Sequence, residues 1–244
     1  MKKSTWLAVV CLVVALCSGF SVNAHAESTM KCPTGTYDML DWMMLDSSLR
    51  GVYHMEGSAN PLYSNLRDGK FYWTKGANGA PWDIQLFDSK FIYLWITEYD
   101  WNDPHTFKKF AGNTNMPLVP RCAKGGFPGS TITVPNTSYQ TYTDCTHYTT
   151  QTLLKGVNQV WGPYKMTLGG ILPKNLPVLV ASYRYNCDSN YGNCRDKEEY
   201  YLAQKYGLVQ WAHYSLVSGK YQVRQTTLFN RLVAGKTTPS FSCF

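Results

Sequence analysis

Apolar and polar residues alternate with the period of β-strands through most of the chain. The strongest signal is the run Phe91–Glu98, which is rich in aromatic and β-branched residues, and shorter runs at 70–74 and 82–87 precede it across turn-forming residues. The C-terminal third has the pattern of a meander. The other predicted strands are 131–134, 160–168, 177–185, 198–203, 207–216 and 220–229.

One segment, residues 36–50, has the period of a helix instead. Leu40, Met43 and Met44 share one face, and we expect this face to pack in the core because methionine fills irregular gaps. Thr36 is placed to cap the start of the helix, and Gly51 is suited to end it.

One helix followed by many strands predicts a mainly β fold. We expect an antiparallel β-sandwich or bent sheet, jelly-roll-like, with one N-terminal helix. A parallel α/β fold is disfavoured because strands and helices do not alternate. Pro117, Pro120 and Pro135 are interpreted as loop corners, and no stretch has the composition of a flexible linker. Residues 27–244 are therefore predicted to form a single domain.

Residues 1–26 have the three parts of a secretory signal peptide. Lys2 and Lys3 form a positive start, an apolar stretch follows, and Ala24-His25-Ala26 has the small-x-small form of a cleavage site. The alternative is an anchor helix, for which the apolar stretch is short. We therefore expect a secreted or periplasmic protein, with no membrane span in the mature chain.

Composition narrows the function classes only modestly. The chain is 15% aromatic and 16% charged, too apolar to be disordered, and its glycines and prolines lack the period of collagen. Cleavage of the signal peptide would reduce the formal net charge of +7 by two. The remaining positive charge is mild and favours acidic partners such as polyanionic glycans or an anionic envelope surface. Nucleic acid is not an expected partner, because an exported chain without a basic aromatic stripe lacks that signature.

Six cysteines remain after the signal peptide, and an even number in an exported chain predicts three disulfides. Six cysteines allow 15 pairings, so the sequence leaves the pairing open. Spacing favours Cys187–Cys194 across a polar loop, Cys122–Cys145 across a Gly/Pro-rich excursion, and Cys32–Cys243 at the two ends of the mature chain. A metal site is disfavoured because Cys-x-x-Cys pairs are absent from the sequence.

The segment from Tyr200 to Trp211 reads Tyr-Tyr-Leu-Ala-Gln-Lys-Tyr-Gly-Leu-Val-Gln-Trp. It resembles a hairpin found in many exported bacterial β-sheet proteins of unknown function, where Tyr-Tyr-x-Ala and Gly-Leu-Val-x-Trp close a meander. The resemblance covers about a dozen residues. It implies an antiparallel sheet and an exported bacterial protein, and it carries no site residues.

The richest polar cluster follows the strongest strand. Glu98, Asp100, Asp103 and His105 surround Trp101, so oxygen ligands for Ca²⁺ or a general acid and base lie close together in sequence. An indole beside hydrogen-bonding groups is also suited to stacking on a sugar ring. The alternative is a strand-end turn in which the carboxylates bind nearby backbone N–H groups.

Two further candidates lie on predicted strands. His213 shares a strand face with Trp211, while Tyr214 lies on the opposite face. Arg184 lies on another strand, and a His or Tyr base with an Arg opposite a uronate carboxylate is the chemistry of jelly-roll polysaccharide lyases. That chemistry requires these residues to converge on one concave face; a half-buried structural histidine is the alternative.

The sequence contains no Gly-x-Ser-x-Gly elbow and no His-Glu-x-x-His pair, and the Gly-rich segment at 125–129 lacks a phosphate-loop lysine. Neither a cofactor nor a metal is therefore predicted. Three hypotheses remain: a glycan-binding module, a polysaccharide lyase or hydrolase, and a structural or interaction protein of the cell envelope. The first is favoured among the specific functions, and whether the protein is an enzyme stays open.

Overall fold

The structure is a computed structural model. The predicted signal peptide lies outside the residues that it describes, as does the whole of the segment 99–105. The described residues are 30–57, 61–67, 69–75, 80–98, 106–110, 116–135, 137–153, 155–235 and Cys243.

Within these residues the fold is mainly β. One antiparallel sheet of 15 strands folds back on itself, so that two halves face each other, and a separate pair is formed by β1 (Thr36–Asp38) and β9 (Cys122–Lys124). Strands that are neighbours in the sheet are mostly neighbours in the chain. This order is that of a meander rather than the paired Greek keys of a jelly roll. The predicted antiparallel, mainly β class is confirmed.

One half of the sheet is built by the N-terminal and middle parts of the chain. Its strand order is β2-β3-β4-β5-β6-β7-β11-β12, with β8 paired to β6. Its strands are β2 (Tyr53–Gly57), β3 (Pro61–Arg67), β4 (Lys70–Lys75), β5 (Ala80–Phe87), β6 (Phe91–Glu98), β7 (Phe107–Phe110), β8 (Pro117–Pro120), β11 (Thr137–Tyr142) and β12 (Tyr148–Leu153).

The other half is built mainly by the C-terminal part. Its strands are β10 (Gly126–Val134), β13 (Gly156–Met166), β14 (Leu176–Cys187), β15 (Cys194–Ala203), β16 (Gly207–Val217) and β17 (Lys220–Ala234).

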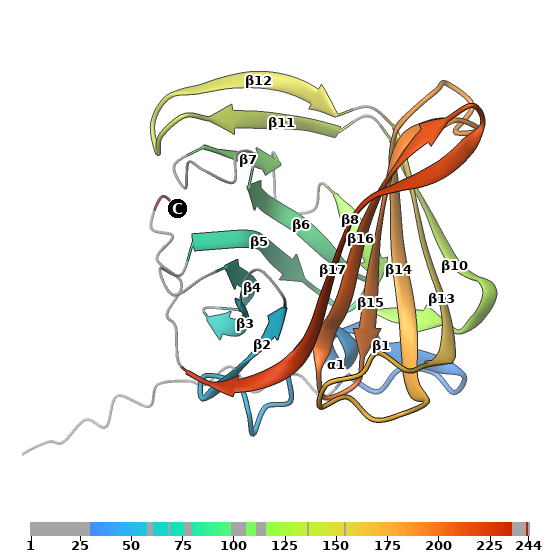
Figure 1. Ribbon diagram of the computed structural model, residues 1–244. Helices are drawn as coiled ribbons and strands as arrows, with labels where there is room; N and C mark the ends of the chain where they lie inside the picture. Colours follow the sequence, from blue (N-terminus) through green and yellow to red (C-terminus); the bar gives the residue numbers. More distant parts are fainter. Residues whose placement is uncertain are drawn as a thin grey trace, which may run out of the picture.

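Two features join the halves. The 15-residue strand β17 pairs with β16 along its first part and with β2 along its last part, with an irregularity in register between Phe229 and Arg231. Figure 1 shows β17 crossing in this way from one layer into the other. Away from β17, the buried Asn158 of β13 donates from Nδ2 to the carbonyl of Pro117 in β8, at 2.7 Å. The halves therefore enclose a common interior.

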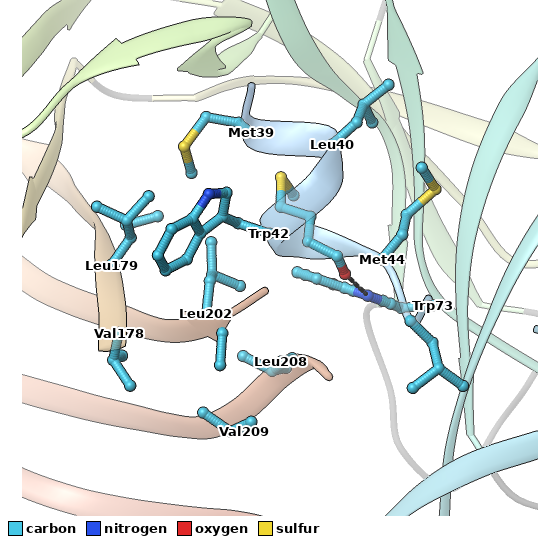
Figure 2. Packing of buried hydrophobic residues seen from close by; sticks show 14 of the residues in the cluster. Met39, Leu40, Trp42, Met44, Trp73, Val178, Leu179, Leu202, Leu208 and Val209 are labelled. Carbon is cyan, nitrogen blue, oxygen red and sulfur yellow. Dashed lines mark hydrogen bonds between the residues drawn. The ribbon is translucent and has the colours of Figure 1, made fainter. Parts of the chain in front are cut away.

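The main core lies between the halves beside a short helix, α1 (Met39–Met43). Trp42 of α1 points toward the strands that carry Leu179 and Leu202, and Trp73 donates from its indole Nε1 to the carbonyl of Met43, at 3.3 Å (Figure 2). Burial of large apolar side chains is the dominant favourable term in folding, so this cluster anchors the two halves against each other.

The helix is much shorter than the predicted 36–50, and its cap is Asp38 rather than Thr36. Oδ1 of Asp38 accepts a hydrogen bond from the backbone N–H of Leu40, at 3.0 Å. The same carboxylate forms two hydrogen bonds with the buried Arg121, at 2.6 and 2.8 Å. Pairing of β1 with β9 holds residues 36–38 extended, and Leu45 forms an isolated β-bridge to Tyr206. Residues on both sides of the helix therefore form β-type contacts, which keeps the helix short.

Residues 117–120 form a strand rather than the predicted loop corner. Proline cannot donate a backbone hydrogen bond, so it is confined to strand edges, and β8 lies off the main path of the sheet with β6 as its partner. Pro135 lies between β10 and β11, as a loop corner should.

Three disulfides are present, but only one of the three predicted pairs is correct. Cys187–Cys194 closes the β14–β15 turn as predicted. The other two are Cys32–Cys122 and Cys145–Cys243, so the predicted pairs Cys32–Cys243 and Cys122–Cys145 are wrong.

The reason for this pairing lies in the strands that each cysteine adjoins. Cys32 precedes β1, whose partner β9 begins at Cys122. Cys145 lies in the turn between β11 and β12, and Cys243 packs near Tyr142 at the end of β11. Figure 1 shows the β11–β12 hairpin and the β1–α1 region at opposite ends of the molecule.

Candidate functional site

A cavity of about 300 Å³ lies between the two halves of the sheet. Both polar and aromatic side chains line it. The residues that matter most for its chemistry are Trp82, Asp83, Thr97, Lys108, Tyr183, Tyr185, Glu198, Tyr200, Trp211 and His213.

The alternation of strand residues builds one wall of the cavity. Tyr183 of β14, Glu198 of β15 and His213 of β16 occupy one row of register, and Tyr200 lies opposite Trp211 in the next inward-facing row. Residues two apart on a strand share a face, so all five side chains point toward the other half of the sheet. The predicted common face of Trp211 and His213 is confirmed.

Glu198 is the centre of a hydrogen-bond network on this wall. Its Oε2 accepts from the hydroxyl of Tyr200, at 2.7 Å, and from Nε1 of Trp211, at 3.0 Å. Its Oε1 accepts from the hydroxyl of Tyr185, at 3.2 Å. Hydrogen bonds to a carboxylate are stronger than those between neutral groups, so the three contacts hold the carboxylate in place and orient the rings.

Aromatic rings continue from this network across the interior. Trp82 meets Trp211 edge to face, with ring centroids 5.7 Å apart, and Tyr200 stacks on Trp73 at the same centroid distance. The His213 ring lies nearly parallel to Trp211, with centroids 6.3 Å apart. These rings brace each other, and each such pair contributes about 0.5–1.5 kcal/mol beyond its area burial.

The opposite wall supplies one further carboxylate and one amine. A register irregularity between Trp73 and Thr74 lets both Trp82 and its neighbour Asp83 line the cavity. Asp83 is buried, at 3% exposed. Lys108 of β7 also lines the cavity, and burial lowers its pKa while the negative charge of Glu198 acts in the opposite direction.

The tyrosine hydroxyls of the cavity stay protonated at neutral pH. Burial raises the pKa of Tyr200 and Tyr183 well above the ordinary value, and the charge of Glu198 raises both further. The same two causes raise the pKa of Tyr185. These hydroxyls therefore act as hydrogen-bond donors rather than as bases in this environment.

The candidates predicted from sequence have different outcomes. Trp101, Asp100, Asp103 and His105 lie outside the described residues, and of Glu98 only the backbone, at the end of β6, is described. The segment they occupy joins β6 to β7, and Thr97 and Lys108 near its two ends line the cavity. Their convergence on one site therefore stays a prediction.

Arg184 and His213 do not converge. Arg184 lies in a register row with Lys197 and Tyr214 on the outer face of the sheet, where its Nη2 donates to Oε1 of Gln159, at 3.4 Å. His213 faces the interior, and its Nε2 lies 3.9 Å from Oδ1 of Asp196. An arginine and a histidine on opposite faces of one sheet cannot act on one substrate, so the predicted lyase pair is wrong.

Glu198, Tyr200, Asp83 and Lys108 are cavity residues that the sequence analysis missed as candidates. A signal for Glu198 and Tyr200 was available, because they share strand parity with each other and face the Trp211–His213 strand across the predicted hairpin. Asp83 and Lys108 come from the other half of the sheet, and no local pattern places them opposite Glu198.

Among the described residues, no group of three or more His, Cys, Asp or Glu side chains is placed to hold a metal ion. Over that same part of the chain, the structure contains no helix long and apolar enough to cross a membrane. No protein-family model, curated protein or solved structure matches the chain.

Proposed function

We propose that the protein binds a small saccharide in the cavity between the two halves of its sheet. The observation that carries the proposal is Glu198, a carboxylate held by Tyr185, Tyr200 and Trp211 at the cavity wall. Sugar rings combine apolar faces with hydroxyl groups, so they fit sites that place aromatic rings beside fixed polar groups.

Size and charge narrow the class of ligand. A cavity of about 300 Å³ lies at the small end of the usual range for ligand pockets, which favours a monosaccharide or disaccharide over a polymer. Glu198 and Asp83 supply acceptors, and Lys108 supplies a donor of opposite charge. A neutral ligand rich in hydroxyl groups satisfies both kinds of partner.

The compartment fits this proposal. Three disulfides are consistent with an extracellular or periplasmic location, because thiols stay reduced in the cytosol. An envelope protein with a purely structural role is less well supported, since such a protein has no need of a cavity that unites carboxylates with aromatic rings.

Calorimetric titration with a panel of neutral, amino and acidic monosaccharides and disaccharides tests the proposal. Trp211→Leu should weaken binding by roughly tenfold or more, the loss of about 1.4 kcal/mol of contact. Trp95→Leu is the matched control, because Trp95 is a half-buried tryptophan that does not line the cavity. Failure of the folded wild-type protein to bind any member, or an equal loss in both variants, would overturn the proposal.

Hydrolysis of a glycosidic bond is a second candidate, favoured by one observation. Asp83 and Glu198 both line the cavity, and glycoside hydrolases act with a pair of carboxylic acids. On this candidate, release of reducing ends from an oligosaccharide panel should occur with the wild-type protein and be abolished by both Asp83→Asn and Glu198→Gln. Binding without release would leave the protein a binding module.

A further inference from the structure

A second hollow lies on the outside of the molecule, away from the cavity. It is an open groove of about 630 Å³ between β1, the start of β10 and β13. Trp161 is on its wall and pairs with Val180, whereas their neighbours Val160 and Ala181 pack in the core. The groove and the cavity are therefore on opposite faces of this half of the sheet.

Aromatic rings and glycines line the groove. Phe127 is 84% exposed and Tyr164 is 38% exposed, and the Phe127 and Trp161 rings meet edge to face with centroids 6.4 Å apart. Gly126 lies opposite Gly162 in register, and a Cβ placed on Gly126 would meet nothing within 4 Å. Exposed aromatic side chains that lie together on a surface are typical of interaction sites.

The groove continues into a polar patch on the outer face. Glu199 accepts hydrogen bonds there from the hydroxyls of Tyr201 and Tyr214, at 2.7 and 2.8 Å, and pairs with Lys197 at 2.8 Å. Burial, followed by the charges of Glu199 and Tyr214, raises the pKa of Tyr164 to about 12. Trp161 of the groove, Val180 and Tyr201 of the patch occupy one row of register, so the patch adjoins the groove on this face.

We propose that this groove is a second binding site, which takes an uncharged polysaccharide chain across Phe127, Trp161 and Tyr164. The side chains that line it carry no formal charge, and the adjacent Lys197 and Glu199 neutralise each other, so the surface complements an uncharged partner. Its open form and its continuation onto a hydrogen-bonding patch suit a chain of sugar units. The proposal does not depend on saccharide binding in the cavity.

The occupant that competes with a polysaccharide is a proline-rich peptide, because such peptides also dock in aromatic-lined grooves. The polar patch favours the sugar, since a polyproline helix presents few hydrogen-bonding side groups to match the half-buried tyrosines Tyr201 and Tyr214. A proline-rich peptide is therefore included among the probes, so that the two outcomes differ.

Affinity electrophoresis in gels containing soluble hydroxyethyl-cellulose, xylan or dextran tests the site. At least one polymer should retard the wild-type protein, and Phe127→Ala should weaken this retardation by roughly tenfold or more in apparent affinity. Phe127→Ala leaves the fold intact because the ring is almost fully exposed. Trp161→Ala should have the same effect where circular dichroism shows it to be folded.

Two control variants distinguish binding in the groove from binding in the cavity or at exposed aromatic rings in general. Tyr148→Ala removes another exposed aromatic ring, 52% exposed and outside the groove, and should leave retardation unchanged. Trp211→Leu alters the cavity but should also leave the retardation unchanged. Failure of the groove site is then distinguishable from failure of the cavity site. Retardation by none of the polymers, equal loss in Tyr148→Ala, or Phe127-dependent binding of a proline-rich peptide instead would overturn the proposal.

Discussion

Replacement of Glu198 by glutamine removes a charge and changes little in shape, so it isolates the role of that charge. Tyr200 and Trp211 both donate to Oε2, and the indole N–H cannot accept a hydrogen bond. The glutamine oxygen must therefore take the Oε2 position, which leaves the amide nitrogen facing Tyr185. The Tyr185 hydroxyl can turn to accept from this nitrogen, so all three contacts survive in neutral form.

The expected loss of stability in Glu198→Gln follows from the number of hydrogen bonds that become neutral, which is three. A hydrogen bond to a charged group contributes about 1.5–3 kcal/mol and a neutral one about 0.5–1.5 kcal/mol, so each contact loses about 1 kcal/mol. Glu198→Gln should lower the free energy of unfolding by about 3 kcal/mol. Glu198→Ala should cost more, because it also leaves the indole donor unsatisfied in the interior.

Urea unfolding at neutral pH measures the change, and alkaline titration of tyrosine absorbance provides an independent readout. The charge of Glu198 helps to raise the pKa of Tyr183, Tyr185 and Tyr200, so the variant should form tyrosinate at lower pH than the wild-type protein. A variant as stable as the wild type, with an unchanged tyrosine titration, would refute the assigned network.

Three further predictions concern stability. Arg121→Leu leaves the charge of Asp38 buried without its partner and should lower the free energy of unfolding, measured with denaturant, by about 3–5 kcal/mol. Adding Asp38→Asn should restore part of this loss, and a double variant whose loss is the sum of the two single losses would contradict the pairing. Replacing both cysteines of Cys32–Cys122, separated by 90 positions, should lower the free energy of unfolding by ~5 kcal/mol, against ~2 kcal/mol for Cys187–Cys194, separated by 7, because the longer loop loses more entropy when it is closed. Calorimetry that shows the reverse order would contradict this argument. Burial and the Asp88 carboxylate raise the pKa of Tyr93 to about 12. The contribution of protonated Tyr93 to folding stability is therefore present below the unfolded pKa near 10 and is lost as the pH rises toward 12. Tyr93→Phe should flatten that part of the pH–stability curve, and an unaltered slope would contradict the role assigned to Tyr93.

The strands of the C-terminal meander were predictable because their signal is local. The run Gly207–Val217 alternates inward and outward residues, and its strand assignment needs no knowledge of its partners. The polar segments Thr137–Tyr142 and Tyr148–Leu153 were missed for the opposite reason. Their threonines and tyrosines favour strands, but the segments lack a clear alternation of apolar and polar residues, and pairing with each other and with Phe107–Phe110 is what establishes the strands.

The disulfides show the same difference between local and long-range information. Cys187 and Cys194 face each other across one hairpin, so their spacing was enough to predict the bond. The bond from Cys32 to Cys122 depends on which distant strands meet, and spacing along the chain contains no information about that.

The candidate site was predictable only in part. Strand parity placed Trp211 and His213 on one face, and the same parity, applied to β14, places Tyr183 and Tyr185 inward and Arg184 outward once the register is known. The register depends on pairing, which the sequence does not specify. Asp83 and Lys108 complete the cavity only because the sheet folds back on itself.

The shared strand β17 has a consequence for the order in which the molecule can fold. Arg231 of β17 donates to the carbonyl of Gly57 in β2, 174 positions earlier in the chain. A ribosome therefore produces β2 long before its neighbour exists, and the edge of β2 stays open until β17 has been made. Pairings of this range are slow to form and leave strand edges exposed meanwhile, so we expect refolding to be slow and sensitive to protein concentration.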